Sequence, residues 1–314
     1  MKTVPAPMKK IKKMLNDFFE YEGAVFRPPR EWDSLIIQAT VGCSRNSCLF
    51  CVMYKKKRFR VRSFEEIKSD IARIPAAYRE SVKKIFIADG NALCMNTDGL
   101  IEMSGYFKET FPALRHLSAY ANPLDLLEKT DGELKAIRAS GIKNLYVGIE
   151  SGSDEVLKLV KKEGSYVQAR LALNRAHAAG FVVSATILLG VGGKLYSMEH
   201  ARRSAELMNE TSPKFINTLT TSIYEGSGLI PLIRSEKFEV LTDRETVDEH
   251  YEFIKRIDAN HVIYRSTHAS NMLSLEGALS KDKKKLLETL AKFKDENDSN
   301  PSFNLLKAGG RYEF

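Results

Sequence analysis

The sequence lacks the features that mark secreted, membrane-spanning and fibrous proteins. It has only four cysteines in 314 residues, and three of them lie within nine residues, where no disulfide framework would place them. No stretch approaches about eighteen uninterrupted apolar residues, which argues against a transmembrane helix. The first thirty residues contain Lys9, Lys10, Lys12 and Lys13 but no apolar segment typical of a signal peptide. We therefore expect a protein of the cytoplasm with no membrane partner.

Composition and charge are those of an ordinary globular protein. Hydrophobic residues make up 43% and charged residues 28% of the chain, enough for a substantial core. The net charge of +8 is compatible with an anionic partner such as a nucleic acid. However, the lysines are spread over an N-terminal helix, residues 55–62 and a C-terminal helix. This spread favours solvated helix faces over a nucleic-acid surface.

From residue 35 onward, short β-branched runs alternate with longer amphipathic stretches, a pattern typical of parallel strands connected by helices. The six predicted strands are Leu35–Thr40, Lys84–Asp89, His116–Ala121, Asn144–Ile149, Val182–Leu189 and Phe215–Thr221. The predicted helices between them include Ser63–Ile74, Asp131–Ser140, Tyr166–Ala179 and Ser197–Asn209. Gly141 and Gly180 follow two of these helices, where a glycine C-cap is expected.

Six strand–helix units predict an α/β fold, a partial (βα)6 TIM-like barrel, with an N-terminal helix and a helical C-terminal extension. We expect residues 1–33 to form the N-terminal helix and extended approach, residues 34–225 the barrel, and residues 226–314 the mostly helical extension. Polar residues follow directly on the apolar runs, for example at Thr40, Asp89 and Glu150. In a barrel of this kind, the functional site lies at these carboxyl ends of the strands.

The loop after the first predicted strand carries Cys43, Cys48 and Cys51 in a C-x4-C-x2-C spacing. Three thiolates on one short loop suit three irons of a cubane cluster and leave the fourth iron open to chelate a small molecule. A structural zinc site would need a fourth, distant ligand such as Cys94 or His116. Three buried cysteines without a ligand are the other alternative, but their close spacing beside a charged loop argues against it.

This loop resembles the C-x3-C-x-aromatic-C motif of the radical S-adenosylmethionine (SAM) superfamily, with one extra residue between the first two cysteines. The resemblance extends over residues 34–225 and is to the elongator-type and oxygen-independent coproporphyrinogen oxidase-like branch. It implies that Cys43, Cys48 and Cys51 bind an oxygen-sensitive [4Fe–4S] cluster. It also implies that Phe50, at the aromatic position, lines the nucleoside of SAM.

After the second strand, the resemblance implies a turn that binds the amino group of the methionine moiety. Here the turn reads Ala88-Asp89-Gly90-Asn91, in which Gly90 keeps the glycine of the family. Asp89, Gly90 and Asn91 are therefore the candidates for this contact. An ordinary turn at the end of a strand is the alternative.

After the fourth strand, the segment Gly148–Gly152 is similar to the ribose-binding strand end of the superfamily. A carboxylate accepts two hydroxyl hydrogen bonds well, which favours Glu150, with Ser151 beside it. A helix-capping role is the alternative for Ser151. Lys162 lies where related members place a basic partner for the cofactor carboxylate, although Lys161 could take this role or either lysine could be solvated.

The fifth strand resembles the adenine-contacting strand of the family, with Leu188 against the base and Gly190 allowing a close approach of the backbone. The run from Gly190 to Lys194 is not a phosphate-binding loop, because it lacks the spacing and the Ser or Thr after the lysine.

The resemblance implies that one electron breaks SAM into methionine and a 5′-deoxyadenosyl radical, which abstracts hydrogen from a substrate. An electron donor such as flavodoxin or ferredoxin is then required. The candidates for facing the substrate, and so for catalysis, are Tyr54, Tyr120, Asn122 and His268. An iron–sulfur binding or electron-transfer protein with a nucleic-acid or protein partner is the alternative.

Overall fold

The computed structural model describes residues 16–304. Within them the chain forms two compact units, each made of several segments of the sequence. The first unit comprises residues 16–44, 53–146 and 175–182, and the second comprises residues 45–52, 147–174 and 183–304. The N-terminal helix expected within residues 1–33 falls largely on residues 1–15, which lie outside the described residues.

Parallel strands form the centre of the first unit. Strands β1 (Leu35–Gln38), β4 (Lys84–Ala88) and β5 (His116–Ala121) lie in that hydrogen-bonded order, and β6 (Ile142–Glu150) begins in this unit and ends in the second. Leu35 pairs with Ile85, and Lys84 with His116. A separate antiparallel pair is formed by β2 (Thr40–Val41) and β3 (Arg60–Val61). The sequence did not predict this short pair, because two-residue strands show no periodicity.

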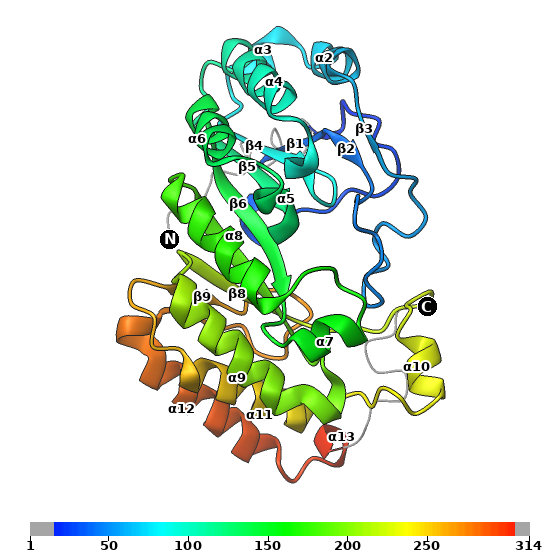
Figure 1. Ribbon diagram of the computed structural model, residues 1–314, viewed down its shortest axis with the longest axis vertical. Coiled ribbons are helices and arrows are strands. Elements are labelled where there is room, and N and C mark those ends of the chain that lie inside the picture. Colours follow the sequence, from blue (N-terminus) through cyan, green and yellow to red (C-terminus); the bar gives the residue numbers. More distant parts are fainter. Residues whose placement is uncertain (1–15, 305–314) are drawn as a thin grey trace. The chain divides into compact units, whose positions relative to one another are not determined.

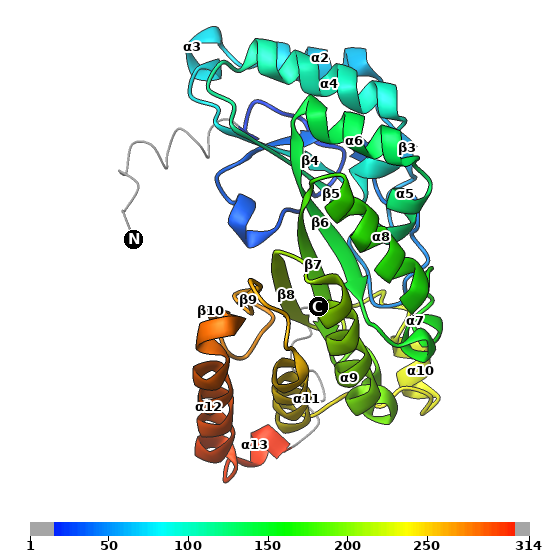
Figure 2. The same cartoon turned by 60° about the vertical axis from the view of Figure 1, so that its left-hand side comes forward.

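Helices cover the strands of the first unit. They are η1 (Pro29–Glu31), α2 (Phe64–Ala72), α3 (Ala76–Arg79), η2 (Ala92–Cys94), α4 (Thr97–Thr110), α5 (Pro123–Leu127) and α6 (Asp131–Ser140). Figures 1 and 2 show α4 and α6 side by side, outside the strands. Ser63 with Glu66 and Thr130 with Glu133 form capping boxes that fix the starts of α2 and α6. Gly141 ends α6 with a φ of +120°, as the sequence predicted.

The second unit continues the alternation. Strands β7 (Val182–Leu189) and β8 (Phe215–Thr220) are parallel, β9 (Ile263–Arg265) is parallel to β8, and β10 (Glu276–Ala278) is antiparallel to β9. Helix α8 (Tyr166–Ala178) begins in this unit and ends in the first. The other helices are α7 (Asp154–Leu159), α9 (Gly193–Thr211), α10 (Ile230–Arg234), α11 (Asp243–Arg256), α12 (Leu279–Asn297) and α13 (Pro301–Asn304). Helix α11 packs against both α9 and α12 (Figure 1).

All six predicted strands are present, with ends that differ by at most two residues from the prediction. The α/β class with a mostly parallel sheet is therefore confirmed. Helix α9 begins four residues earlier than predicted, at Gly193, because the chain turns into the helix directly after β7. Each unit buries its own large apolar side chains, such as Phe86 and Phe107 in the first and Phe253 and Tyr264 in the second. Within residues 16–304, every helix is too short or too polar to cross a membrane.

Candidate cofactor site

The cysteine-bearing loop begins two residues after β2. Cys43 belongs to the first unit, Cys48 and Cys51 belong to the second, and all three are half-buried. Backbone contacts hold residues 45–52 in the second unit. The Leu49 N–H donates to the carbonyl of Val160 at 2.8 Å, and the Ser227 hydroxyl donates to the carbonyl of Leu49 at 3.1 Å. This part of the loop therefore has a defined path.

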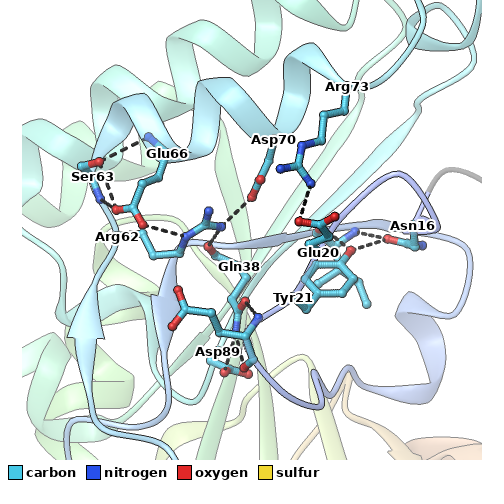
Figure 3. Close-up of polar contacts among 12 residues, drawn as sticks. Asn16, Glu20, Tyr21, Gln38, Arg62, Ser63, Glu66, Asp70, Arg73 and Asp89 are labelled. Atoms are coloured by element: carbon cyan, nitrogen blue, oxygen red, sulfur yellow. Dashed lines mark hydrogen bonds and ion pairs between the residues drawn. The ribbon is translucent and has the colours of Figure 1, made fainter.

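Asp89, directly after β4, is fully buried and serves as an acceptor for three different donors. Its Oδ2 accepts from Gly42 N at 3.1 Å, Gln38 Nε2 at 3.1 Å and Lys57 Nζ at 2.6 Å. Its Oδ1 is buried without a hydrogen-bond partner among the described residues. Figure 3 shows the hydrogen bond between Gln38 and Asp89 among the polar contacts of the first unit. One oxygen of the Asp89 carboxylate therefore has no donor among the described residues.

Gly90 packs directly on Cys43. A Cβ atom at position 90 would lie 2.5 Å from Cys43 Cβ and 2.9 Å from Cys43 Cα, so no larger residue fits without moving the loop. The Gly90 N–H donates to the Gly42 carbonyl at 3.0 Å. The end of β4 and the start of the cysteine loop therefore form one tightly packed piece of backbone.

Asn91 fixes the same loop from its side chain. Its Oδ1 accepts from Ser44 N at 3.0 Å, and its Nδ2 donates to Ser44 Oγ at 2.7 Å and to the carboxylate of Asp125 at 3.1 Å. The sequence pointed to Asn91 but not to Asp125 or Lys57. Lys57 lies in a run of basic residues, a pattern that indicates exposure to solvent. Asp125 lies in the first turn of a helix, where an acidic residue is common without any functional role.

In the second unit, Glu150 ends β6 with a φ of +66° and is half-buried. Burial raises the pKa of Glu150, and the nearby positive charge of Lys162 opposes this rise. Lys162 is only 8% exposed, whereas Lys161 is exposed. The structure thus brings Lys162 within electrostatic reach of Glu150.

Ser151 lies in a buried polar turn before α7. Its hydroxyl is 2.8 Å from His200 Nδ1 and accepts from Ser153 N at 3.0 Å, and Ser153 is the N-cap of α7. Next to it, a Cβ at Gly152 would lie 2.4 Å from the carbonyl oxygen of Arg203, so the turn packs on the backbone of α9.

Gly190, directly after β7, has a φ of +76°, and a carboxyl group fixes its backbone. Gly190 N donates to Glu249 Oε1 and Ser197 Oγ donates to Glu249 Oε2, both at 2.6 Å. Glu249 is fully buried, and burial raises its pKa to about 7. No local pattern in the sequence pointed to Glu249, because it lies on α11, about sixty residues after the strand it supports.

Leu188 and Phe50, the two side chains expected against the nucleoside, both pack on one hydrophobic cluster of the second unit. Its buried members are Val156, Val160, Val191, Ile223, Leu229 and Phe238. The structure therefore brings together two residues that are well separated in the sequence.

The four candidates for facing the substrate have different surroundings. Tyr54 is buried with its ring edge-on to Phe26, and Tyr120 belongs to an aromatic group with Phe86 and Tyr146.

Asn122 is the N-cap of α5 and accepts from Leu124 N at 3.0 Å. His268 is 2.8 Å from the hydroxyl of Ser270, and burial lowers the pKa of His268. The Ser270 hydroxyl also accepts from Thr220 N at 3.0 Å, which ties this segment to the carboxyl end of β8.

Within residues 16–304, no group of three or more His, Cys, Asp and Glu side chains is arranged so that it could hold a metal ion. The chemistry of the donor set and the packing around Cys43 nevertheless suit the group that the sequence implies. The three thiols are soft ligands, and Gly90 leaves room for the Cys43 backbone. The assignment of the three cysteines as cluster ligands stays a prediction.

Comparison with solved structures finds the same fold in several proteins at low sequence identity. Coproporphyrinogen III oxidase (HemN) from Escherichia coli is 18% identical with a TM-score of 0.53, over 77% of this chain and 54% of that protein. Elp3 from the archaeon Methanocaldococcus infernus is 14% identical with a TM-score of 0.51, over 73% of this chain and 58% of Elp3. Methylornithine synthase (PylB) is 16% identical with a TM-score of 0.50, over 93% of this chain and 89% of that one.

This chain thus spans little more than half of HemN and of Elp3. At these identities the likeness shows the fold alone, which agrees with a partial TIM-like barrel. No protein with curated annotation matches the sequence.

The family model of the radical SAM superfamily matches residues 37–208, more than half of the chain. The match starts within β1 and includes the cysteine loop and the ends of β4, β6 and β7. The chain therefore belongs to the radical SAM superfamily and is a radical SAM enzyme, for which the family implies a [4Fe–4S] cluster and SAM as cofactors.

Proposed function

We propose that Cys43, Cys48 and Cys51 hold the [4Fe–4S] cluster and leave one iron for SAM. The observation that carries this proposal is the packing of Gly90 on Cys43, which joins the turn after β4 to the first cysteine. When bound, the reduced cluster supplies one electron that cleaves SAM to methionine and a 5′-deoxyadenosyl radical. The residues around it bind, orient and shield the reactants.

Asp89 and Asn91 have separate roles in this proposal. Asp89 Oδ1 accepts a hydrogen bond from the amino group of the methionine moiety, because it is a buried acceptor without a partner in the described chain. Lys57 holds the opposite oxygen and neutralises the carboxylate. Asn91 does not need to touch the cofactor, since its amide already holds Ser44 and Asp125 and so positions the loop.

Glu150 accepts hydrogen bonds from the two ribose hydroxyls in the proposed site. A carboxylate binds a pair of hydroxyls best when ionised, and the positive charge of Lys162 favours that form. Leu188 and Phe50 provide an apolar surface for the nucleoside, and Gly190 offers its backbone to the base. Ser151 supports the turn through His200.

We propose that the electron donor is an acidic carrier such as flavodoxin or ferredoxin and that Tyr54, Tyr120, Asn122 and His268 lie on the substrate side. His268 has the best support, because its segment is tied to the carboxyl end of β8. The division into a barrel at residues 34–225 with an extension at residues 226–314 is part of the same proposal.

The test is SAM cleavage without a substrate. Anaerobically reconstituted protein is mixed with dithionite and SAM, and 5′-deoxyadenosine is measured by chromatography. We expect it from the unaltered protein but not from Cys48→Ala, which loses a cluster ligand and the brown colour of the cluster.

Cys94→Ala is the matched control. Cys94 is the last residue of η2 and lies outside the three-cysteine loop, so the proposal does not use it as a ligand. This variant should keep both the colour and the cleavage. Equal loss of the cluster in both variants would place Cys94 among the ligands and contradict the proposal of an open iron.

A further inference from the structure

The first unit has an open hollow of about 670 Å³ beside the cysteine loop. Its lining consists of Glu22, Gly23, Val41 and residues 56–60. Val41 is the last residue of β2 and lies two residues before Cys43. The hollow is therefore lined by the strand that leads into the first cysteine of the loop.

The basic residues of the hollow fall into two classes. Lys57 is bound to Asp89, and Arg60 pairs with Glu66 at 2.7 Å and with Glu22, so both serve the internal structure. Lys56 and Arg58 are exposed, and neither has an ion pair within the described chain. The positive charges of Lys56 and Arg58 are therefore available to attract a negatively charged partner to the hollow.

Apolar side chains are exposed among these charges. Met53 is 46% exposed, Phe59 37% and Val61 45%. These three large apolar side chains are exposed within nine positions of the sequence, among basic residues, and exposed apolar side chains bordered by charges are typical of a protein-binding surface. We call Met53, Lys56, Arg58, Phe59 and Val61 the basic-apolar surface.

The backbone connects this surface to the cysteine loop. Val41 pairs with Arg60 and Thr40 with Val61 in the β2–β3 ladder. A Cβ at Gly42, the residue before Cys43, would lie 3.2 Å from Lys57 Cβ and 3.7 Å from Phe59 Cα. A protein bound here would therefore rest against the strand that leads into the cluster loop.

We propose that the basic-apolar surface docks an acidic, low-potential one-electron carrier protein with a flavin or iron–sulfur centre. This inference rests on the proposed function. The carrier is oxidised by one electron, the cluster is reduced by one electron, and no bond or proton changes place. Charge complementarity favours the acidic carrier, and the exposed Met53, Phe59 and Val61 favour a folded protein over a nucleic acid, whose contacts are mostly with phosphates.

The test compares the unaltered chain with the double variant Lys56→Glu/Arg58→Glu. The probe is reduced bacterial flavodoxin under anaerobic conditions. Its affinity is measured by calorimetry, and 5′-deoxyadenosine formation is followed with flavodoxin or with dithionite as the reductant. We expect the double variant to bind flavodoxin roughly tenfold or more weakly and to cleave SAM more slowly with flavodoxin. Cleavage with dithionite should stay unchanged.

Lys284→Glu/Lys285→Glu on α12 is the matched control, because it makes the same change of charge at exposed positions of the other unit. It should bind flavodoxin like the unaltered chain. Equal weakening by both double variants, or by neither, overturns the docking proposal. So does tighter binding of a fluorescent RNA oligonucleotide that only Lys56→Glu/Arg58→Glu removes.

The two proposals fail in different ways. If the unaltered chain forms no 5′-deoxyadenosine even with dithionite, the proposed function fails. If dithionite supports cleavage but the surface variants leave flavodoxin binding and flavodoxin-driven cleavage intact, only the docking surface fails.

Discussion

At the scale of single residues, the candidate site depends on two features of the turn after β4: the missing side chain of Gly90 and the carboxylate oxygen of Asp89 that is unpaired within residues 16–304. Gly90 has no side chain, and this lets the turn after β4 lie against Cys43. Asp89 is held by three donors on one oxygen, while its other oxygen has no partner in the described chain. The sequence could identify Asp89 and Gly90 by their position after an apolar run. It could not show that Lys57 donates a hydrogen bond to the carboxylate of Asp89.

Gly90→Ala should disrupt the cysteine loop. Its added methyl group would meet Cys43 at 2.5 Å, and relieving such a clash in packed backbone costs about 1–3 kcal/mol. We expect bound iron and sulfide per chain after reconstitution to fall several-fold, while the circular dichroism spectrum stays that of the folded protein.

Gly105→Ala in α4 is the control, because a Cβ there would have nothing within 4 Å. Replacing this helical glycine should stabilise the protein by about 0.5–1 kcal/mol and leave the iron content unchanged. If Gly90→Ala retains full iron content, the contact with Cys43 does not constrain the cluster loop.

At the scale of elements, a buried polar network joins β7, α9 and α11. Glu249 on α11 binds the N–H of Gly190 at the end of β7 and the hydroxyl of Ser197 on α9. His200 Nε2 lies 3.8 Å from Glu249 Oε1, and burial lowers the pKa of His200 to about 4, so this ring is neutral near pH 7. The carboxylate thus fixes the strand end that is expected to meet the adenine.

Glu249→Gln should change how stability depends on pH. The folded-state pKa of Glu249, about 7, lies above its ordinary value of 4.5, so between these values the folded state holds a proton that the unfolded state releases. This contribution to stability is present at low pH and lost as the pH rises to 7. Glutamine cannot titrate, so the unfolding free energy of the variant relative to the unaltered chain should rise by about 2–3 kcal/mol from pH 5 to pH 7.

Urea unfolding of both proteins at pH 5 and pH 7 measures this difference. The unfolded-state titration of His200 and of His250, whose pKa burial lowers to about 3, occurs in both chains and cancels. A relative stability that is constant between the two pH values would mean that Glu249 is ionised throughout.

At the scale of the whole molecule, cofactor binding adds to stability. A ligand that binds only the folded state stabilises it by about 2.7 kcal/mol at a concentration one hundred times its dissociation constant. Saturating SAM should therefore raise the midpoint of thermal unfolding of the anaerobic, cluster-loaded protein, measured by scanning fluorimetry.

The same addition should leave the midpoint of Cys48→Ala nearly unchanged, because the proposed site lacks the open iron when the cluster is absent. An equal increase in both proteins would show that SAM binds without the cluster and would remove the cluster from the recognition of SAM.

The sequence by itself determined the order of strands and helices, because the spacing of apolar residues and the helix-capping residues are local features of the chain. Its six strands and the glycine that ends α6 were predictable in this way. It also determined the three-cysteine loop, since spacing along the chain limits which metal a loop can bind.

Only the tertiary structure decided which distant residues support the site. Lys57 reaches Asp89, Asp125 holds Asn91, and Glu249 holds Gly190 through contacts between residues 32, 34 and 59 positions apart. It also decided that Lys162 is buried and Lys161 exposed, although the two are neighbours of the same chemical type. Such pairings depend on how the chain folds back on itself, and a single sequence carries no local pattern that records them.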